Sequence, residues 1–85
     1  MPKSLFTGDH HSHVEVLIAA RKDAGLTQTE LDSKIGKDQT FISIIERSQR
    51  RVDVLEFYAI ATAIGVDPVM LFQRVAEKLP PRIEI

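Results

Sequence analysis

Apolar residues recur along this chain at intervals of three and four positions, and glycine, proline, hydroxyl and acidic residues interrupt them repeatedly. Such spacing places the apolar residues on one face of an amphipathic α-helix. The chain shows no hairpin signature, no internal repeat and no low-complexity segment. The pattern therefore predicts an all-α fold, a compact bundle of about five helices.

The first helix is expected to begin at Ser12, because Ser12 and Glu15 have the spacing of a capping box. Gly25 follows the last apolar position and is expected to end this helix. The side chains that the helix would bury share one face and are Val14, Leu17, Ile18 and the stem of Arg21.

Two short helices are predicted next, with only two or three residues between them. Thr27 and Glu30 form a second capping box, and Gly36 can adopt the left-handed conformation that stops a helix. Asp38 is the expected cap of the following helix, which ends near Arg47. The inward positions are Leu31 and Ile35 in the first of these helices and Ile42 and Ile45 in the second. A connection this short requires the two helices to cross at a steep angle.

The last two helices carry equally clear start signals. Asp53 and Glu56 form a third capping box, and Gly65 closes that helix. Asp67 followed by Pro68 is expected to start the final helix. Proline has no N–H group, and at the first helical position an N–H group would have no partner within the helix, so proline costs nothing there. The expected core positions are Val54, Phe57, Ala61 and Ile64 in the fourth helix and Leu71, Phe72, Val75 and Leu79 in the fifth.

The length of 85 residues fits one domain. We divide it into a flexible N-terminus at 1–11, a domain at 12–79 with a central helix-turn-helix at 27–47, and a C-terminal tail at 80–85. The chain has no cysteine, which excludes disulfides and thiolate metal sites. No apolar run reaches the roughly 18 residues that span a bilayer, and the N-terminus lacks the apolar stretch of a signal peptide. We therefore expect a cytoplasmic protein without a membrane partner.

Several segments at fixed spacing resemble the Cro and phage-repressor (XRE) helix-turn-helix family. They are ARKDAGLTQTEL at 20–31, KIG at 34–36, FISIIER at 41–47, DVLEF at 53–57 and AIGVDP at 63–68. The resemblance covers roughly residues 14–72. It implies a lambda-repressor-like domain in a non-enzymatic bacterial or phage-encoded regulator, with double-stranded DNA as partner and no cofactor. In that family the second helix lies across the DNA backbone and the third enters the major groove.

That geometry implies two sets of DNA contacts in the present chain. The first set would read base edges from the outward face of the third helix and comprises Gln39, Thr40, Ser43 and Ile44. Gln39 can form a bidentate pair with adenine, whereas Ile44 either touches a thymine methyl group or completes packing under the next loop. The second set would contact phosphates and comprises Thr27, Gln28, Lys37, Arg47, Arg50 and Arg51. The simpler alternatives are an exposed helix residue at Gln28 and a solvated charge run at the arginines.

Four further positions have structural consequences. The resemblance implies a partly buried salt bridge between Arg21 and Glu46, which would join the first helix to the end of the third. Asp32 stands where the family usually has alanine, so its carboxylate must find a partner or distort the helix crossing. Ser48 stands where glycine commonly follows the third helix, and a left-handed backbone there would cost serine on the order of 1 kcal/mol.

A single helix-turn-helix reads only a few base pairs, so we expect a homodimer on a palindromic operator with half-sites about one helical turn apart. The fifth helix is the expected interface, because it offers more apolar surface than one small core can absorb. The interface residues would be Val69, Phe72, Gln73, Ala76 and Leu79. Such a regulator is expected to act as a repressor.

Two other classes of function compete with DNA binding. Asp9, His10, His11 and His13 form the one metal-like cluster of the sequence, but no remote ligand, nucleophile or base completes a site, so we expect no functional metal and no enzyme activity. The net charge of -1 and the pI near 6.3 permit a protein-interaction module, such as an antitoxin subunit with a protein partner. The basic residues of segment 36–52 favour DNA instead.

Overall fold

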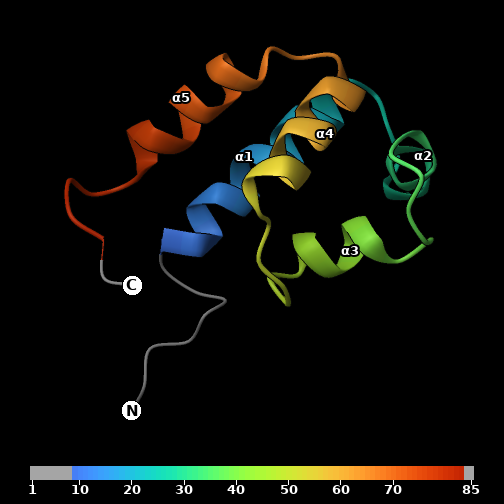
Figure 1. The fold of residues 1–85 in the computed structure, drawn as a ribbon, viewed down its shortest axis with the longest axis horizontal. Coiled ribbons are helices and arrows are strands. Elements are labelled where there is room, and N and C mark those ends of the chain that lie inside the picture. The colour runs from blue at the N-terminus through green and yellow to red at the C-terminus, as the bar shows by residue number, and fades with distance from the viewer. Residues whose placement is uncertain (1–8, 84–85) are drawn as a thin grey trace.

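Five α-helices and their connecting turns form the part of the protein that the computed structural model describes, residues 9–83. In chain order they are α1 (Asp9–Asp23), α2 (Gln28–Lys34), α3 (Phe41–Glu46), α4 (Val54–Ile64) and α5 (Pro68–Lys78), as Figure 1 shows. The predicted all-α class with five helices is therefore confirmed.

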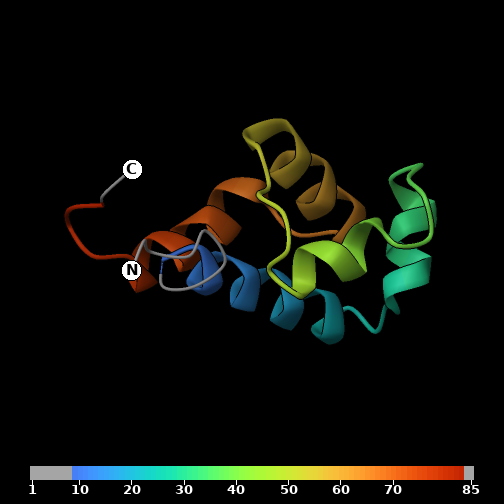
Figure 2. The ribbon, with the colours of Figure 1, turned by 90° about the horizontal axis from the view of Figure 1, so that it is seen from below.

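The helices are spread along the long axis of the molecule. α2 lies at one end, α5 lies at the other, and α1 and α4 lie between them (Figure 1 and Figure 2). α1 packs against α3, α4 and α5, and α2 packs against α3 and α4. Among the described residues no single helix is long and apolar enough to cross a membrane, and only the pair α4 and α5, bent by 117°, meets that test by length and composition.

Local capping residues start three of the helices as predicted. The Thr27 hydroxyl accepts a hydrogen bond from the Glu30 amide at 3.0 Å, and the Glu30 carboxylate accepts from the Thr27 amide at 2.8 Å. Asp53 and Glu56 form the same reciprocal pair at the start of α4. The Asp67 carboxylate caps α5 through a backbone amide at 2.8 Å. These bonds satisfy helix N–H groups that would otherwise lack a partner.

The predicted start of α1 at Ser12 is wrong, because the helix begins at Asp9. The additional residues extend α1 before Ser12 and bring His11 to 4.0 Å from Glu15, one turn further along. Contacts between positions i and i+4 support such an extension. Residues 1–8 of the expected flexible N-terminus and residues 84–85 of the expected tail lie outside the described part of the chain.

The predicted cap of α3 at Asp38 is also wrong. The helix begins at Phe41, and Thr40 occupies the N-cap position. The Phe41 amide donates to the Asp38 carbonyl at 3.1 Å, so residues 38–41 form a tight turn before the helix. α3 is therefore shorter than the sequence predicts, with six residues.

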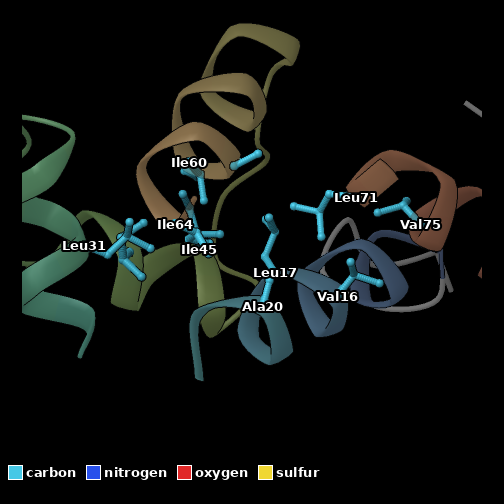
Figure 3. Close-up of a cluster of buried hydrophobic side chains, with 11 residues drawn as sticks. Val16, Leu17, Ala20, Leu31, Ile45, Ile60, Ile64, Leu71 and Val75 are labelled. Atoms are coloured by element: carbon cyan, nitrogen blue, oxygen red, sulfur yellow. The ribbon is translucent and has the colours of Figure 1, made fainter. Parts of the chain in front are cut away.

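The core is a cluster of aliphatic side chains that come from all five helices (Figure 3). Leu17 of α1 lies near its centre, between Leu71 of α5 on one side and Ile45 of α3 on the other. Among the described residues, the apolar side chains with at most 2% exposure are Val14, Leu31, Ile42, Ile45, Ile60, Ala61, Leu71 and Val75. Burial of these side chains is the main term that holds the short helices together.

Two residues expected in this core lie on the surface. Val54 is 82% exposed, because it opens α4 in a turn that extends beyond the core. Phe72 is 54% exposed and contacts only the edge of the core, where its ring meets Phe57 at 6.1 Å between centroids. α4 buries the expected Ala61 and Ile64, and Ile60 joins them from the second half of the helix.

Candidate nucleic-acid interface

α2, the turn after it and α3 form a helix-turn-helix. Gly36 has a φ of 69°, the left-handed conformation that ends α2. Leu31 on α2 and Ile42 and Ile45 on α3 are each no more than 2% exposed and belong to one cluster. Residues 37–40 between the helices are all exposed. The unit therefore presents the turn before α3 to solvent, while the inner faces of both helices are fixed by the core.

The expected salt bridge between α1 and α3 is present. Arg21 Nε donates to Glu46 Oε2 at 2.6 Å, and Arg21 Nη2 donates to Glu46 Oε1 at 3.0 Å. The two side chains are only 10% and 8% exposed. Arg21 Nη1 also donates to the Leu26 carbonyl at 2.7 Å. This bidentate pair ties the C-terminal end of α3 to α1 in a water-poor site.

The four residues expected at base edges divide into two pairs. Gln39 and Thr40 are exposed, but they lie in the turn before α3, whereas we had predicted them on the helix itself. Ser43 and Ile44 lie on α3 and are half-buried. The Ser43 hydroxyl donates to the Thr40 carbonyl at 3.0 Å, which joins the helix to the turn. The exposed candidates for direct contact are therefore concentrated at the N-terminal end of α3.

Three cations expected to contact phosphates are exposed in the segments that precede and follow α3. Arg47 is the C-cap residue of α3, and Arg51 lies in the loop that leads to α4. Lys37 lies in the turn between α2 and α3, where its ammonium group is 5.3 Å from the centre of the Phe41 ring. These side chains carry positive charge on both sides of α3, although the net charge of the whole chain is -1.

Arg50 has a different environment from the neighbouring arginines. Its guanidinium donates two hydrogen bonds to the Glu56 carboxylate, at 3.0 and 2.9 Å, and lies 5.0 Å from the centre of the Phe41 ring. The hydrogen bonds with Glu56 raise the pKa of Arg50. The hydrogen bond from Arg50 lowers the pKa of Glu56, and the Asp53 amide adds to this effect while burial opposes it. Arg50 therefore joins the start of α3 to the start of α4.

Thr27 and Gln28, expected to contact a phosphate at the start of α2, both have partners within the protein. The Thr27 hydroxyl accepts the capping bond from the Glu30 amide, and hydrogen bonds from the Thr27 backbone and side chain lower the pKa of Glu30. Gln28 Nε2 donates to Glu46 Oε1 at 2.8 Å, so the side chain joins the Arg21 pair. Gln28 therefore supports α3, a role that the sequence did not indicate.

Both departures from the family pattern are accommodated. Asp32 is 1% exposed, and its Oδ1 accepts from the Ile42 amide at 2.8 Å, which is the partner that a carboxylate at this crossing requires. Ser48 has a φ of 58°, so the backbone there is left-handed as glycine would allow. Its side chain is buried, with its hydroxyl 3.4 Å from His11 Nδ1.

An apolar groove of about 520 Å³ lies toward the end of the molecule opposite α2, between the start of α4 and α5. Val69 is 71% exposed and, with Phe72 and Gln73, lines this groove as part of the expected dimer interface. Ala76 is exposed but does not line the groove, and Leu79 packs against the core instead. The groove therefore includes only the first half of the predicted face of α5.

The exposure of four apolar residues in the first turns of α4 and α5, two of which line the groove, was not expected from the sequence. They are Val54, Leu55, Tyr58 and Met70, with exposures between 59% and 82%. The sequence could have predicted the exposure of the first three. The segment 54–64 has apolar residues on all sides of the helix, and one small core covers only one side. The apolar face thus extends from α5 onto the first turns of α4.

Among the described residues, no group of three or more histidine, cysteine, aspartate or glutamate side chains could hold a metal ion. The His13 ring packs edge-on against Phe57, with centroids 5.6 Å apart, and lines the groove. His11 lies beside Ser48 and Glu15. The side chains of Asp9 and His10 lie outside the described part of the structure.

A short helix, a tight turn and a second crossing helix, with an exposed polar turn between flanking cations, define a helix-turn-helix DNA-binding domain. A model of the helix-turn-helix family matches residues 17–71. The chain belongs to this family, which comprises XRE-type, DNA-binding transcription regulators and not enzymes.

The chain resembles known proteins in both sequence and structure. It is 39% identical over 51 residues to the uncharacterized HTH-type transcriptional regulator y4dJ of Sinorhizobium fredii, a match that covers 60% of this chain and 66%, just under two thirds, of that protein. An XRE-family like protein from Pseudomonas syringae pv. tomato has a TM-score of 0.78 and 36% identity, covering 85% of this chain and 88% of that one. The restriction-modification controller protein C.Esp1396I, solved as a tetramer with its natural 35 base-pair operator, has a TM-score of 0.76 and 26% identity, covering 85% and 95%.

Proposed function

We propose that this protein is a dimeric transcriptional repressor that binds operator DNA with α3 in the major groove. The observation that carries the proposal is the exposed polar turn at Gln39 and Thr40, directly before a helix that the core and a salt bridge hold in place. In helix-turn-helix proteins this end of the second helix of the motif contacts base edges. The cations on both sides suit the phosphates that border the groove.

Sequence preference would come mainly from two side chains. Gln39 is exposed and can pair with both N6 and N7 of adenine, a contact that discriminates between bases by about 1–3 kcal/mol. The Ser43 proton is already donated to the Thr40 carbonyl, so on DNA the Ser43 oxygen would accept from an amino group of adenine or cytosine. Half-buried Ile44 would add at most a contact with a thymine methyl group.

Affinity for any sequence would come from the exposed cations Lys37, Arg47 and Arg51. Arg50 would contribute less than its neighbours, because a phosphate would have to replace the two hydrogen bonds to Glu56. Thr27 would add a hydroxyl contact at the start of α2. For Gln28, an outward contact with a phosphate would require the side chain to leave Glu46.

Dimerisation would use the apolar groove and the exposed side chains beside it. A monomer that exposes Val54, Tyr58, Val69 and Phe72 along one groove has more apolar area uncovered than single scattered residues account for. The C.Esp1396I controller occupies its operator as a tetramer, so that protein places several copies of this fold on one DNA site. We propose that two copies of the present chain pair through this surface and read two half-sites.

The experiment starts from duplexes selected from a random DNA pool with the full-length protein. Binding of a selected and a random duplex is then measured at about 50 and about 200 mM salt. Gln39→Ala is expected to reduce binding of the selected duplex by about tenfold and to change binding of the random duplex little. Arg51→Ala should weaken both duplexes alike and reduce the salt slope by about one. If neither duplex binds at about 50 mM salt, or if binding does not weaken between about 50 and about 200 mM salt, the DNA proposal is rejected and the protein-interaction module is favoured.

The oligomeric state is tested separately by light scattering with and without DNA. Wild type is expected to have twice the mass of one chain at micromolar concentration, and Phe72→Ser should give the monomer mass with unchanged helix content. Thr62→Ser is the matched control, because Thr62 is exposed on α4 and does not line the groove, so this variant should keep the dimer mass. A wild-type protein with the mass of one chain, both free and on DNA, would reject the dimer.

A further inference from the structure

Asp32 is the most completely buried polar residue among those described, with 1% of its surface exposed. It lies in the second half of α2 and faces α3. Its Oδ1 accepts a hydrogen bond from the Ile42 amide at 2.8 Å, while Oδ2 has no hydrogen-bond partner in the described structure. Burying a carboxyl group with one of its two oxygens lacking a partner is unfavourable, so the fold retains this group at a cost.

That bond is made at the start of α3, which lacks a cap of its own. Thr40 occupies the N-cap position, but its side chain makes no capping hydrogen bond. The Phe41 amide is satisfied by the Asp38 carbonyl, and the next amide, that of Ile42, is satisfied by Asp32. Asp32 therefore supplies from α2 the side-chain cap that α3 does not have locally.

A cap that comes from another helix fixes more than the helix end. The apolar contacts between α2 and α3, such as those of Leu31 and Ile45, have little directional preference. A hydrogen bond loses its strength when donor and acceptor shift or rotate. Two side-chain hydrogen bonds join α2 to α3 in the described residues, from Gln28 to Glu46 at the C-terminal end of α3 and from Ile42 to Asp32 at its N-terminal end. The second bond therefore constrains the position and rotation of the end of α3 that lies beside Gln39 and Thr40.

We propose that Asp32 is a positioning residue that sets the orientation of α3 for reading DNA by capping that helix from α2. Gln39 and Thr40 lie directly before the capped turn, so a displaced α3 would move them relative to the bases. This inference rests on the proposed function of α3. It assigns to Asp32 an effect on base selectivity, not a contact with DNA, since the side chain is buried.

The first test is a hydrogen-bond measurement on the free wild-type protein. Scalar coupling across the hydrogen bond, between the Ile42 amide nitrogen and the Asp32 carboxyl carbon, is measured by NMR in isotope-labelled protein. A detectable coupling is expected from a bond of 2.8 Å. Its absence would overturn the inference, whatever the result of the DNA-binding experiments, so the cap and the proposed function can fail separately.

The second test compares three variants with the selected and random duplexes of the preceding section. Asp32→Ala removes the acceptor, Asp32→Asn keeps an acceptor oxygen at nearly the same place, and Asp67→Ala is the matched control. Asp67 is also a helix cap, but it belongs to α5 and does not line the groove. All measurements are made below the unfolding transition of each variant.

We expect Asp32→Ala to lower the ratio of selected to random affinity by about tenfold, while binding of the random duplex changes less than about twofold. Asp32→Asn should keep the wild-type ratio within about threefold. Asp67→Ala should leave the ratio unchanged even though it lowers the melting temperature. An unchanged ratio in Asp32→Ala, an equal loss in Asp67→Ala, or a loss in Asp32→Asn as large as in Asp32→Ala would each overturn the inference.

Discussion

Replacing Arg21 with methionine tests how α3 is attached to the rest of the protein. Methionine has a similar length and keeps the apolar stem, so the change removes the guanidinium with little loss of packing. Glu46 would then lose two hydrogen bonds, of 2.6 and 3.0 Å, in a site where its side chain is 8% exposed. The Leu26 carbonyl would lose its donor as well.

The expected loss in the free energy of unfolding depends on the Glu46 carboxylate that remains buried. Removing one member of a buried ion pair costs about 3–5 kcal/mol, because the other charge remains buried without its partner. Glu46 keeps the hydrogen bond from Gln28 at 2.8 Å, which places Arg21→Met at the lower end, about 3 kcal/mol. In a domain of this size each 1 kcal/mol lowers the melting temperature by about 4–8 °C, so the expected decrease is about 12–24 °C.

Urea unfolding followed by circular dichroism at neutral pH measures this cost. The double variant Arg21→Met with Glu46→Met removes both charges, and we expect it to lie within about 1–2 kcal/mol of wild type, the remainder reflecting the unpaired Leu26 carbonyl. A single variant that loses less than about 1 kcal/mol would refute the reasoning. So would a double variant that is no more stable than Arg21→Met.

Three further predictions concern the caps and turns. The pKa of Glu56 lies below its ordinary value of 4.5, chiefly through the hydrogen bond from Arg50, so its ionised form stabilises the fold above that pH and the contribution disappears as pH falls through the lowered pKa. Urea unfolding over a pH series should therefore show Glu56→Gln less stable than wild type at pH near 7, with the gap closing below 4.5. Ser48→Gly should raise the free energy of unfolding by up to about 1 kcal/mol, because φ is 58°, and calorimetry showing a loss would contradict this. Asp53→Ala should cost about 1 kcal/mol in the same assay, since it removes the cap of α4, and no measurable change would count against the capping role.

The sequence alone determined the elements whose signals are local. The capping boxes at Thr27 and Asp53 and the Asp67 cap with its proline lie within four residues of the amides that they satisfy, so the helix starts could be located without tertiary information. The inward positions Ile42 and Ile45 followed from their spacing in the same way. The salt bridge between Arg21 and Glu46 was predicted from the family resemblance and not from the pattern.

The tertiary structure decided which distant groups meet. The start of α3 was misplaced because the amide of Ile42 is satisfied by Asp32, ten residues earlier in the chain, and not by a neighbouring cap. Arg50 was grouped with the other arginines because charge along the chain does not show that Glu56 folds back beside it. The exposed face of α4 depends on how much of an apolar helix one small core covers. Sequence patterns report local backbone preferences and periodicity, whereas these contacts arise only when the helices pack.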